Sequence, residues 1–192
     1  MRTLASLLLL IAAIATVPAV AQQSIPMYPT ITLETNQGDI VLELDGKRAP
    51  ITVANFVTYV RDGHYDGTIF HRVIPGFVAQ AGGYKTDYEE KPTREPIPNE
   101  SGNGLRNVQG SIAMARQGAP HTATSQFFIN LGDNDALDPS PRRWGYTVFG
   151  QVVGGMEVLE KIAAIPTGSG GRFPSDVPQA HVIINKASMS AE

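Results

Sequence analysis

One arginine in an otherwise apolar stretch is the strongest chemical signal in this sequence. Arg72 lies in the run FHRVIPGFVAQ, and a carboxamide, that of Gln80, follows eight residues later. Charged side chains are rarely left among buried residues unless they are paired or take part in function. Arg72 is therefore either a member of a structural ion pair or a group that faces a ligand. The segment taken by itself favours the ion pair.

The same stretch predicts the local structure that would hold Arg72. Its apolar residues are typical of a buried strand, and Pro75-Gly76 divides them, because Pro fixes φ and Gly accepts a positive φ. We expect a strand, a tight turn and a second strand. This hairpin would place Arg72 and Gln80 on neighbouring strands, close together in space.

Other kinds of catalytic site find little support. The chain has no cysteine and no G-x-S-x-G motif, so nucleophilic catalysis is poorly supported. The four histidines lack metal-ligand spacing, and no glycine pattern fits a dinucleotide, so we expect no metal and no other cofactor. Asp133-Asn134-Asp135 resembles the start of a calcium loop, but Leu137 occupies the next ligand position, and we interpret it as a turn. An arginine, an amide and apolar residues suit a reaction that depends on binding and electrostatics.

The first 21 residues have the order of a secretory signal peptide. They contain Arg2, an apolar run over residues 7–15, and Ala19-Val20-Ala21 at the expected cleavage site. Because a spanning helix needs about 20 apolar residues, we expect cleavage rather than an uncleaved anchor. Residues 22–29 would then be an N-terminal extension and residues 30–190 a single domain. We predict an exported, periplasmic protein, with release into the medium as the alternative.

The composition describes a folded, turn-rich chain and excludes some partners. Hydrophobic residues make up 42% of the sequence, with 19 Gly and 14 Pro. A formal charge of −3, with both signs mixed along the chain, provides no basic face for nucleic acid. No second apolar segment suggests a membrane span, so we expect no membrane contact after signal cleavage. We also expect a monomer.

Hydrophobic periodicity predicts short strands and two helices. Alternation on both sides of Gly38 predicts a hairpin over residues 30–45, and a helix should begin at Pro50 and end at Gly63, burying Val53, Phe56, Val57 and Val60. A second helix should follow Gly154-Gly155 and stop at Pro166, with Met156, Leu159 and Ala163 on one face. Further strands are expected in residues 111–115, 126–131, 147–153 and 181–186, and a long surface loop in residues 82–107. This pattern predicts a mostly β protein, a closed antiparallel barrel whose open ends the helices cover.

Four ordered motifs carry a resemblance to a known family. FHRVIPGFVAQAG, SIAMAR, TSQFFINL and GYTVFGQVVGGMEVLEKI follow one another as in the cyclophilin family of peptidyl-prolyl cis-trans isomerases, and the chain resembles the bacterial periplasmic members in particular. The resemblance covers roughly residues 30–186. It implies a closed barrel of eight antiparallel strands capped by two α-helices. It also implies rotation about X-Pro bonds in proline-containing peptides and unfolded exported proteins, a reaction that would assist their folding.

The resemblance implies that Arg72 and Gln80 are the catalytic pair. An X-Pro bond isomerises slowly because its C–N bond has partial double-bond character, with a barrier of about 18–20 kcal/mol. Arg72 would donate hydrogen bonds to the peptide around the proline, and a donor aimed at the prolyl nitrogen would stabilise the twisted state. Gln80 would hold Arg72 and contact the substrate.

The resemblance also implies a set of substrate-binding residues. Phe77, Val78, Phe128 and Leu137 would form an apolar slot for the proline ring, while Gln126 and the backbone at Ala115 and Arg116 would pair with the substrate main chain. Tyr146 completes the set. Ordinary core packing is the alternative for Phe77, Phe128 and Leu137. Because adjacent strand residues point to opposite faces, Phe127 is the better candidate for the core.

Three positions depart from the better-known eukaryotic pattern. Val78 stands where many members have Met, and Tyr146 where many have His. Ala136 stands where members that bind cyclosporin tightly have Trp, which places drug affinity in doubt. Trp144 could reach the rim of the pocket or could pack within its own loop.

Two other functions compete with isomerisation. The same pocket would serve a peptide-binding module or chaperone in which catalysis is incidental, although the presence of both Arg72 and Gln80 favours catalysis. A small-ligand carrier of lipocalin type would need a hollow interior, which the bulky strand residues argue against.

Overall fold

The structure is a computed structural model, which describes residues 24–190. The predicted signal peptide, residues 1–21, and the first two residues of the predicted extension lie outside this range. Among the described residues, no helix combines the length and the apolar character that crossing a membrane requires.

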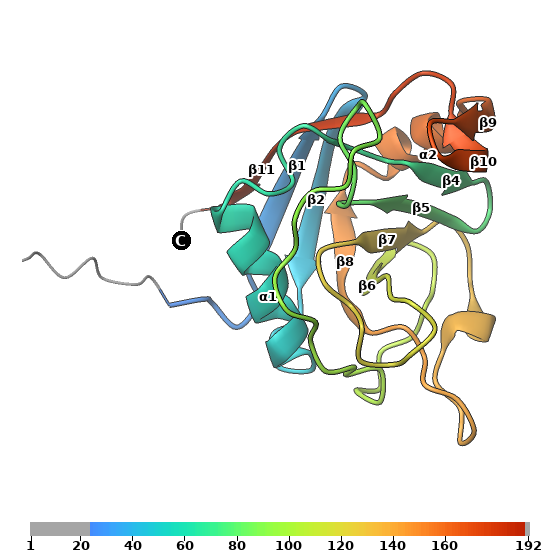
Figure 1. The fold of residues 1–192 in the computed structure, drawn as a ribbon. Coiled ribbons are helices and arrows are strands. Elements are labelled where there is room, and N and C mark those ends of the chain that lie inside the picture. The colour runs from blue at the N-terminus through green and yellow to red at the C-terminus, as the bar shows by residue number, and fades with distance from the viewer. Residues whose placement is uncertain (1–23, 191–192) are drawn as a thin grey trace, which may run out of the picture.

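Most of the regular structure is antiparallel β-sheet (Figure 1). The strands are β1 (Thr30–Thr35), β2 (Gly38–Leu44), β3 (Thr68–Ile69), β4 (Arg72–Ile74), β5 (Val78–Ala81), β6 (Ser111–Met114), β7 (Phe127–Asn130), β8 (Val148–Gly154), β9 (Thr167–Gly170), β10 (Phe173–Pro178) and β11 (Ile183–Met189). The helices are α1 (Pro50–Arg61) and α2 (Met156–Ala164), with a short 3-10 helix at Asp135–Leu137. Every element predicted from periodicity is therefore present, within a few residues of the expected bounds.

The main sheet is curved but not closed by hydrogen bonds. Its strand order is β3-β11-β1-β2-β8-β6-β7-β5-β4, and β9 and β10 form a separate two-stranded sheet. Within residues 24–190 no ladder joins β3 to β4, so the prediction of a closed eight-stranded barrel is wrong, and the sheet is an open half-barrel of nine strands. The physical reason is local. β3 and β4 are separated only by Phe70 and His71, and the amide of Phe70 donates to the carbonyl of Val182 instead of extending a ladder to β4.

Large apolar side chains fill the inside of the curved sheet. The alternating residues Ile31, Leu33, Ile40, Leu42 and Leu44 are all fully buried, as the period of two predicted. They form one cluster with residues from both helices and from β7, β8 and β11. The interior is therefore a packed core, and it does not offer the hollow that a lipocalin-type carrier requires.

Helix α1 closes one side of this core, and its first turn is capped from a distance. Pro50 is the first helical residue, and Val53, Phe56, Val57 and Val60 are buried as predicted. Ala49 provides no side-chain cap. Instead, the Glu100 carboxylate accepts hydrogen bonds from the amides of Ile51 (3.2 Å) and Thr52 (2.8 Å). An acidic group there also opposes the positive end of the helix dipole.

Helix α2 begins at a glycine that no other residue could replace easily. Gly155 has φ +85°, and a Cβ on it would lie 2.1 Å from the carbonyl oxygen of Asp39. The helix buries Val158, Leu159 and Ile162. Met156 packs against the core from a half-buried position, so the predicted face is wrong only at Ala163, which lies outside the core cluster. The helix is rotated so that its two β-branched residues, rather than Ala163, face the core.

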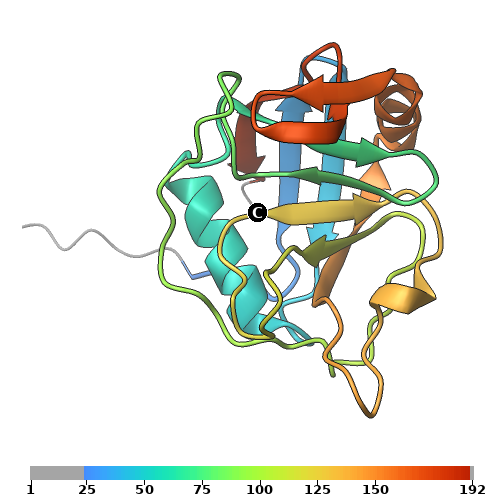
Figure 2. The ribbon, with the colours of Figure 1, turned by 45° about the vertical axis from the view of Figure 1, so that its right-hand side comes forward.

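The β9–β10 hairpin was not predicted, and it lies beside β4 in both views (Figures 1 and 2). Its sequence offers no alternation of apolar and polar residues, since β9 reads TGSG. The ring of Phe173 packs against the rings of His71 (5.3 Å between centroids) and Tyr84 (5.0 Å). This contact attaches the hairpin to the edge of the main sheet.

Candidate functional site

The β4–β5 hairpin brings Arg72 and Gln80 together as predicted. The two residues are directly opposite each other in the ladder, on either side of the Pro75-Gly76 turn. Arg72 Nη1 donates a long hydrogen bond of 3.5 Å to Gln80 Oε1. Gln80 Nε2 in turn donates to Gln126 Oε1 at 3.0 Å. A chain of polar contacts therefore runs across β4, β5 and the start of β7.

The Arg72 guanidinium has an ionic neighbour on its other side. Its Nε lies 3.7 Å from Asp176 Oδ2, in strand β10. The Arg72 side chain keeps 38% of its surface exposed, and its guanidinium carbon lies 6.0 Å from the centre of the Phe77 ring. Arg72 thus forms a partly exposed ion pair, and the same side chain borders an open hollow, so the two interpretations do not exclude each other.

A small apolar cluster on the outer face of the sheet forms the floor of this hollow. Val78, Ala113, Phe128 and Val148 are buried there, apart from the main core, and Phe77, Leu105, Ala115, Leu137 and Tyr146 pack at its edge. Phe127, the neighbour of Phe128, belongs to the main core instead. The prediction that Phe127 and Phe128 face opposite sides is confirmed.

The hollow itself has a volume of about 250 Å³. It is lined by Arg72, Phe77, Val78, Gln80, Ala115, Arg116, Phe128, Leu137 and Tyr146. Gln126 lines a smaller adjoining hollow of about 130 Å³, which shares Gln80, Ala115 and Arg116 with the first. The structure therefore brings all ten predicted site residues to one groove that runs along the outer face of β5, β7 and β6.

Arg116 builds the far wall of the groove through its side chain, whereas only its backbone was expected to contribute. Its guanidinium donates to the carbonyls of Trp144 (2.9 Å) and Gly145 (3.3 Å). It also lies 4.5 Å from the centre of the Tyr146 ring, an arrangement typical of a cation–π contact. Tyr146 meets Phe128 edge to face at 5.6 Å. Trp144 packs its ring against His121 at 5.2 Å, in agreement with a loop-packing role.

Leu137 is held at the groove by a polar network behind it. The amide and the Nδ2 of Asn107 donate to Asp138 Oδ1 at 2.7 and 2.9 Å, and Arg106 Nε donates to Asp138 Oδ2 at 3.0 Å. Partial burial alone would raise the pKa of Asp138, but these hydrogen bonds outweigh it and hold the pKa below its ordinary value. An ionised Asp138 therefore fixes the turn that carries Leu137.

His71 is a buried titratable group directly behind the groove. It is 3% exposed, and its Nδ1 has no hydrogen-bond partner within the described residues. Burial, together with the positive charge of Arg72, lowers the pKa of His71 to about 4, against a hydrogen bond to the backbone of Ile69 that favours the charged form. His71 is therefore neutral at physiological pH, and Arg72 is the cation at this edge.

Sequence reasoning missed Asp176 and the structural role of Gly83. A Cβ on Gly83 would lie 2.6 Å from the Gln126 side chain, so the glycine leaves room for that carboxamide. Neither position was marked by a local pattern. Asp176 lies in an unpredicted hairpin, and the contact of Gly83 joins segments that are far apart in the sequence.

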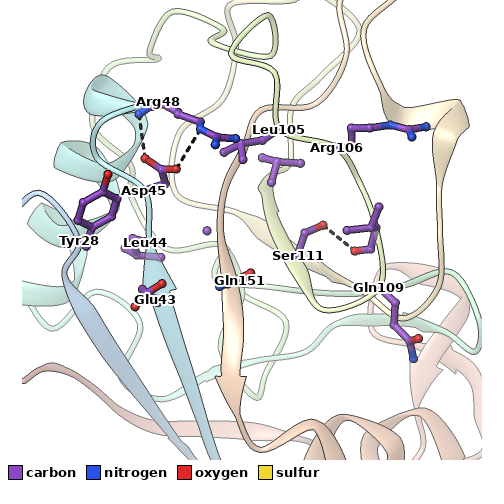
Figure 3. A pocket seen from close by; sticks show the side chains of 13 residues that line it. Tyr28, Glu43, Leu44, Asp45, Arg48, Leu105, Arg106, Gln109, Ser111 and Gln151 are labelled. Carbon is purple, nitrogen blue, oxygen red and sulfur yellow. Dashed lines mark hydrogen bonds and ion pairs between the residues drawn. The ribbon is translucent and has the colours of Figure 1, made fainter.

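A larger hollow of about 370 Å³ lies elsewhere on the outer surface, between the end of β2 and residues 105–111 (Figure 3). Both of its arginines are already engaged by carboxylates. Arg48 Nε lies 3.4 Å from Asp45 Oδ2, and Arg106 points away toward Asp135 and Asp138. Ser111 Oγ donates to the carbonyl of Val108 at 2.7 Å. The smaller groove, where an amide-bound cation meets an apolar floor, is therefore the better candidate site.

Known proteins are similar to this chain in sequence and in architecture. A family model described as cyclophilin type peptidyl-prolyl cis-trans isomerase matches residues 30–189. The chain is 50% identical over 163 residues to peptidyl-prolyl cis-trans isomerase B of Escherichia coli, covering 83% of this chain and 99% of that protein. It is 50% identical over 159 residues to peptidyl-prolyl cis-trans isomerase A of Dickeya dadantii, covering 83% of each.

Solved structures agree. A cyclophilin type peptidyl-prolyl cis-trans isomerase of Cryptosporidium parvum superposes with a TM-score of 0.70 at 26% identity, covering 86% of this chain and 99% of that one. A second crystal structure of that protein, obtained in the presence of the dipeptide ala-pro, gives a TM-score of 0.69 at 25% identity, over 85% and 99% of the two chains.

Proposed function

The chain belongs to the family of cyclophilin-type peptidyl-prolyl cis-trans isomerases, and from this premise we propose that the groove beside Arg72 is its active site. The enzyme rotates X-Pro peptide bonds. The observation that carries the proposal is the ladder register that sets Arg72 opposite Gln80, above an apolar floor centred on Phe128. The Cryptosporidium protein studied with ala-pro supports a proline-containing peptide as the ligand of this groove.

Arg72 acts on the nitrogen of the bond that rotates. In the planar ground states the lone pair of the prolyl nitrogen is shared with the carbonyl group, and it becomes a hydrogen-bond acceptor only as the bond twists. A guanidinium donor at this nitrogen therefore stabilises the transition state more than either ground state, and such differential binding is catalysis. Each ~1.4 kcal/mol of this difference corresponds to a tenfold change in rate. Gln80 holds the guanidinium through the 3.5 Å contact with Nη1.

Different parts of the groove bind the proline ring and the main chain of the substrate. The proline ring occupies the slot made by Phe77, Val78, Phe128 and Leu137, where burial of its apolar surface fixes the pivot of rotation. The amide of Ala115 already donates to the carbonyl of Gln126 at 2.9 Å. The carbonyl of Ala115, the amide of Arg116 and the Gln126 side chain are therefore the groups that we assign to the substrate main chain.

The cellular role that we propose is to assist the folding of exported proteins. Its support is the signal-peptide pattern of residues 1–21, which predicts export and a periplasmic location. Unfolded exported chains contain X-Pro bonds whose uncatalysed isomerisation takes tens to hundreds of seconds. A monomeric, cofactor-free isomerase would shorten that step. Fractionation of cells that express the full chain tests the location, because a protein retained with its first 21 residues in the cytoplasm would contradict it.

Substitution of Arg72 tests the assignment of the active site. We expect Arg72→Ala to lower kcat/KM by at least tenfold in an NMR exchange assay on an Ala-Pro peptide, while the thermal midpoint stays close to that of the parent. Arg72→Lys should recover little, because lysine has the charge but lacks the planar set of fixed donors. Arg61→Lys, an exposed change in the last turn of α1, is the control. An Arg72→Ala variant with parental turnover would remove the groove from the mechanism.

A further inference from the structure

Strand β10 places a carboxylate against the back of the catalytic guanidinium. Asp176 Oδ2 lies 3.7 Å from Arg72 Nε, and both side chains keep a little over a third of their surface exposed. The β9–β10 hairpin that carries Asp176 runs beside β4 (Figure 2). Arg72 therefore has a partner on each side, with Gln80 at Nη1 and Asp176 at Nε. Within residues 24–190, Nη2 has no such partner.

A local irregularity in β10 aims Asp176 at Arg72. The ladder pairs Phe173 with Gly170 and Val177 with Gly168, so residues 174–176 of β10 face residue 169 alone in β9. Extra residues in one strand form a bulge, which bends the strand and redirects side chains. Asp176 has φ +66°, in the left-handed region that few residues other than Gly, Asn and Asp adopt readily. The bulge and the left-handed backbone at Asp176 thus coincide with the ion pair to Arg72.

The hairpin is also fixed relative to Arg72. Phe173 packs on His71, which precedes Arg72, and on Tyr84. Tyr88 covers Gly171 so closely that a Cβ there would lie 2.3 Å from Tyr88 Cγ. The Tyr88 hydroxyl is 3.0 Å from His181 Nε2. Asp176 is therefore attached to the edge of the main sheet by three aromatic contacts, and its position does not depend on the ion pair alone.

We propose that Asp176 is a positioning residue for Arg72, an inference that rests on the proposed function. The long hydrogen bond at Nη1 and the ion pair at Nε orient the guanidinium before the substrate binds, and the Nη2 donors remain for the prolyl nitrogen. A catalytic group that is already oriented pays less entropy in the transition state. Loss of Asp176 should therefore lower kcat and leave KM nearly unchanged, since the apolar slot that binds the proline ring is untouched.

Two substitutions remove the carboxylate and keep the backbone. Asp176→Gly and Asp176→Asn both suit a positive φ, so the bulge and the hairpin should persist. Because a partly exposed ion pair contributes modestly, we expect Asp176→Gly to lower kcat by about three- to tenfold and Asp176→Asn by less. Glu160→Gln, an exposed change in α2 with the same loss of charge, is the matched control and should leave kcat at the parental value.

A spectroscopic readout reports the contact itself. Because both variants remove the negative charge that lies 3.7 Å from Arg72 Nε, the NMR signal of the Arg72 Nε–H group should shift in Asp176→Gly and Asp176→Asn. Thermal unfolding and the ring signals of Phe173 and His71 verify that the hairpin stays in place. If Asp176→Gly releases the hairpin, the comparison of Asp176→Asn with the parent decides.

Three results would overturn the inference. The first is a parental kcat together with an unmoved Nε–H signal in both Asp176 variants. The second is a fall in kcat that is equally large in an Arg72→Ala background, because a positioning residue has nothing to position there. The third is full turnover of Arg72→Ala itself, which would overturn the proposed function as well. An inactive Arg72→Ala with unaffected Asp176 variants would reject the positioning role alone.

Discussion

The apolar side chains at the groove are partly or fully buried, whereas the charged Arg72 side chain stays partly exposed to water. Val78 and Phe128 are almost fully buried, whereas Phe77, Leu137 and Tyr146 are half-buried and remain available to a ligand. Arg72 keeps over a third of its surface exposed. A fully buried guanidinium would carry a large desolvation cost. In the proposed site, its position at the rim lets it meet the substrate nitrogen where water is partly excluded.

Ala136 offers a test of ligand specificity at a single residue. It is exposed in the 3-10 helix Asp135–Leu137, next to Leu137 of the apolar slot. We predict that Ala136→Trp raises cyclosporin affinity at least tenfold, because an indole adds a large apolar surface and an N–H donor. Isothermal titration with cyclosporin measures this change. Ala136→Leu, which adds apolar area without the donor, is the control, and an unchanged affinity in Ala136→Trp would contradict the prediction.

Two adjacent residues of strand β7 have different roles, one in stability and the other in the proposed activity. Phe127 faces the main core and packs against Phe56, Tyr65 and Phe70, while Phe128 faces the groove. We predict that Phe127→Ala lowers the free energy of unfolding by about 3–5 kcal/mol, the usual cost of a large cavity. Phe128→Ala should cost less stability, because its cluster is small and lies at the surface, but should lower kcat/KM strongly. Urea unfolding and the exchange assay on both variants measure the two effects, and equal losses of stability would contradict the division.

The beginning of α1 depends on a residue 48 positions away in the sequence. Glu100 accepts hydrogen bonds from the amides of Ile51 and Thr52 and from the Thr52 hydroxyl at 2.7 Å. We predict that Glu100→Ala lowers the free energy of unfolding by about 1–2 kcal/mol, the usual cost of a lost helix cap. Glu95→Ala, an exposed change in the same loop, should have little effect. Urea unfolding of both variants tests this, and equal stabilities would show that water replaces the cap.

Local sequence patterns predicted strands, helices and turns well where the residues that determine them are close together in the sequence. Period-two alternation located β1 and β2, Pro50 located the start of α1, and Pro75-Gly76 located the turn that pairs Arg72 with Gln80. The cap from Glu100 and the ion pair from Asp176 join distant segments, so no local pattern could reveal them. The β9–β10 hairpin escaped prediction because β9 is glycine-rich and neither strand alternates apolar with polar residues. Its stability comes from Phe173, whose partners are in other parts of the chain.

At the scale of the whole molecule, the sheet order explains why the barrel does not close. The two edge strands, β3 and β4, are consecutive in the chain, so the chain itself spans the place where a ladder would close. Strand count and helix placement can be estimated from periodicity, whereas closure depends on how β3 and β4 are offset around Phe70 and His71. The same junction sets His71 beneath the hairpin and Arg72 above the groove.

This junction makes global stability depend on pH. His71 has a folded-state pKa of about 4 and an ordinary pKa of 6.5, so below pH 6.5 the unfolded chain binds a proton that the folded protein does not. The contribution of His71 is therefore complete above pH 6.5 and is lost as the pH falls toward 4. At ~1.4 kcal/mol per pKa unit, the free energy of unfolding should decrease by roughly 3 kcal/mol over that window. Urea unfolding between pH 7.5 and 4 measures this slope.

The variant His71→Asn isolates the histidine from other titrating groups. Burial lowers the pKa of His64 as well, which gives it a pH dependence of the same sign, but His64 and the carboxylates remain in the variant. His71→Asn should therefore be less stable than the parent at pH 7.5 and should lose less stability on acidification, so that the two curves converge toward pH 4. Parallel curves would contradict the lowered pKa of His71 in the folded protein.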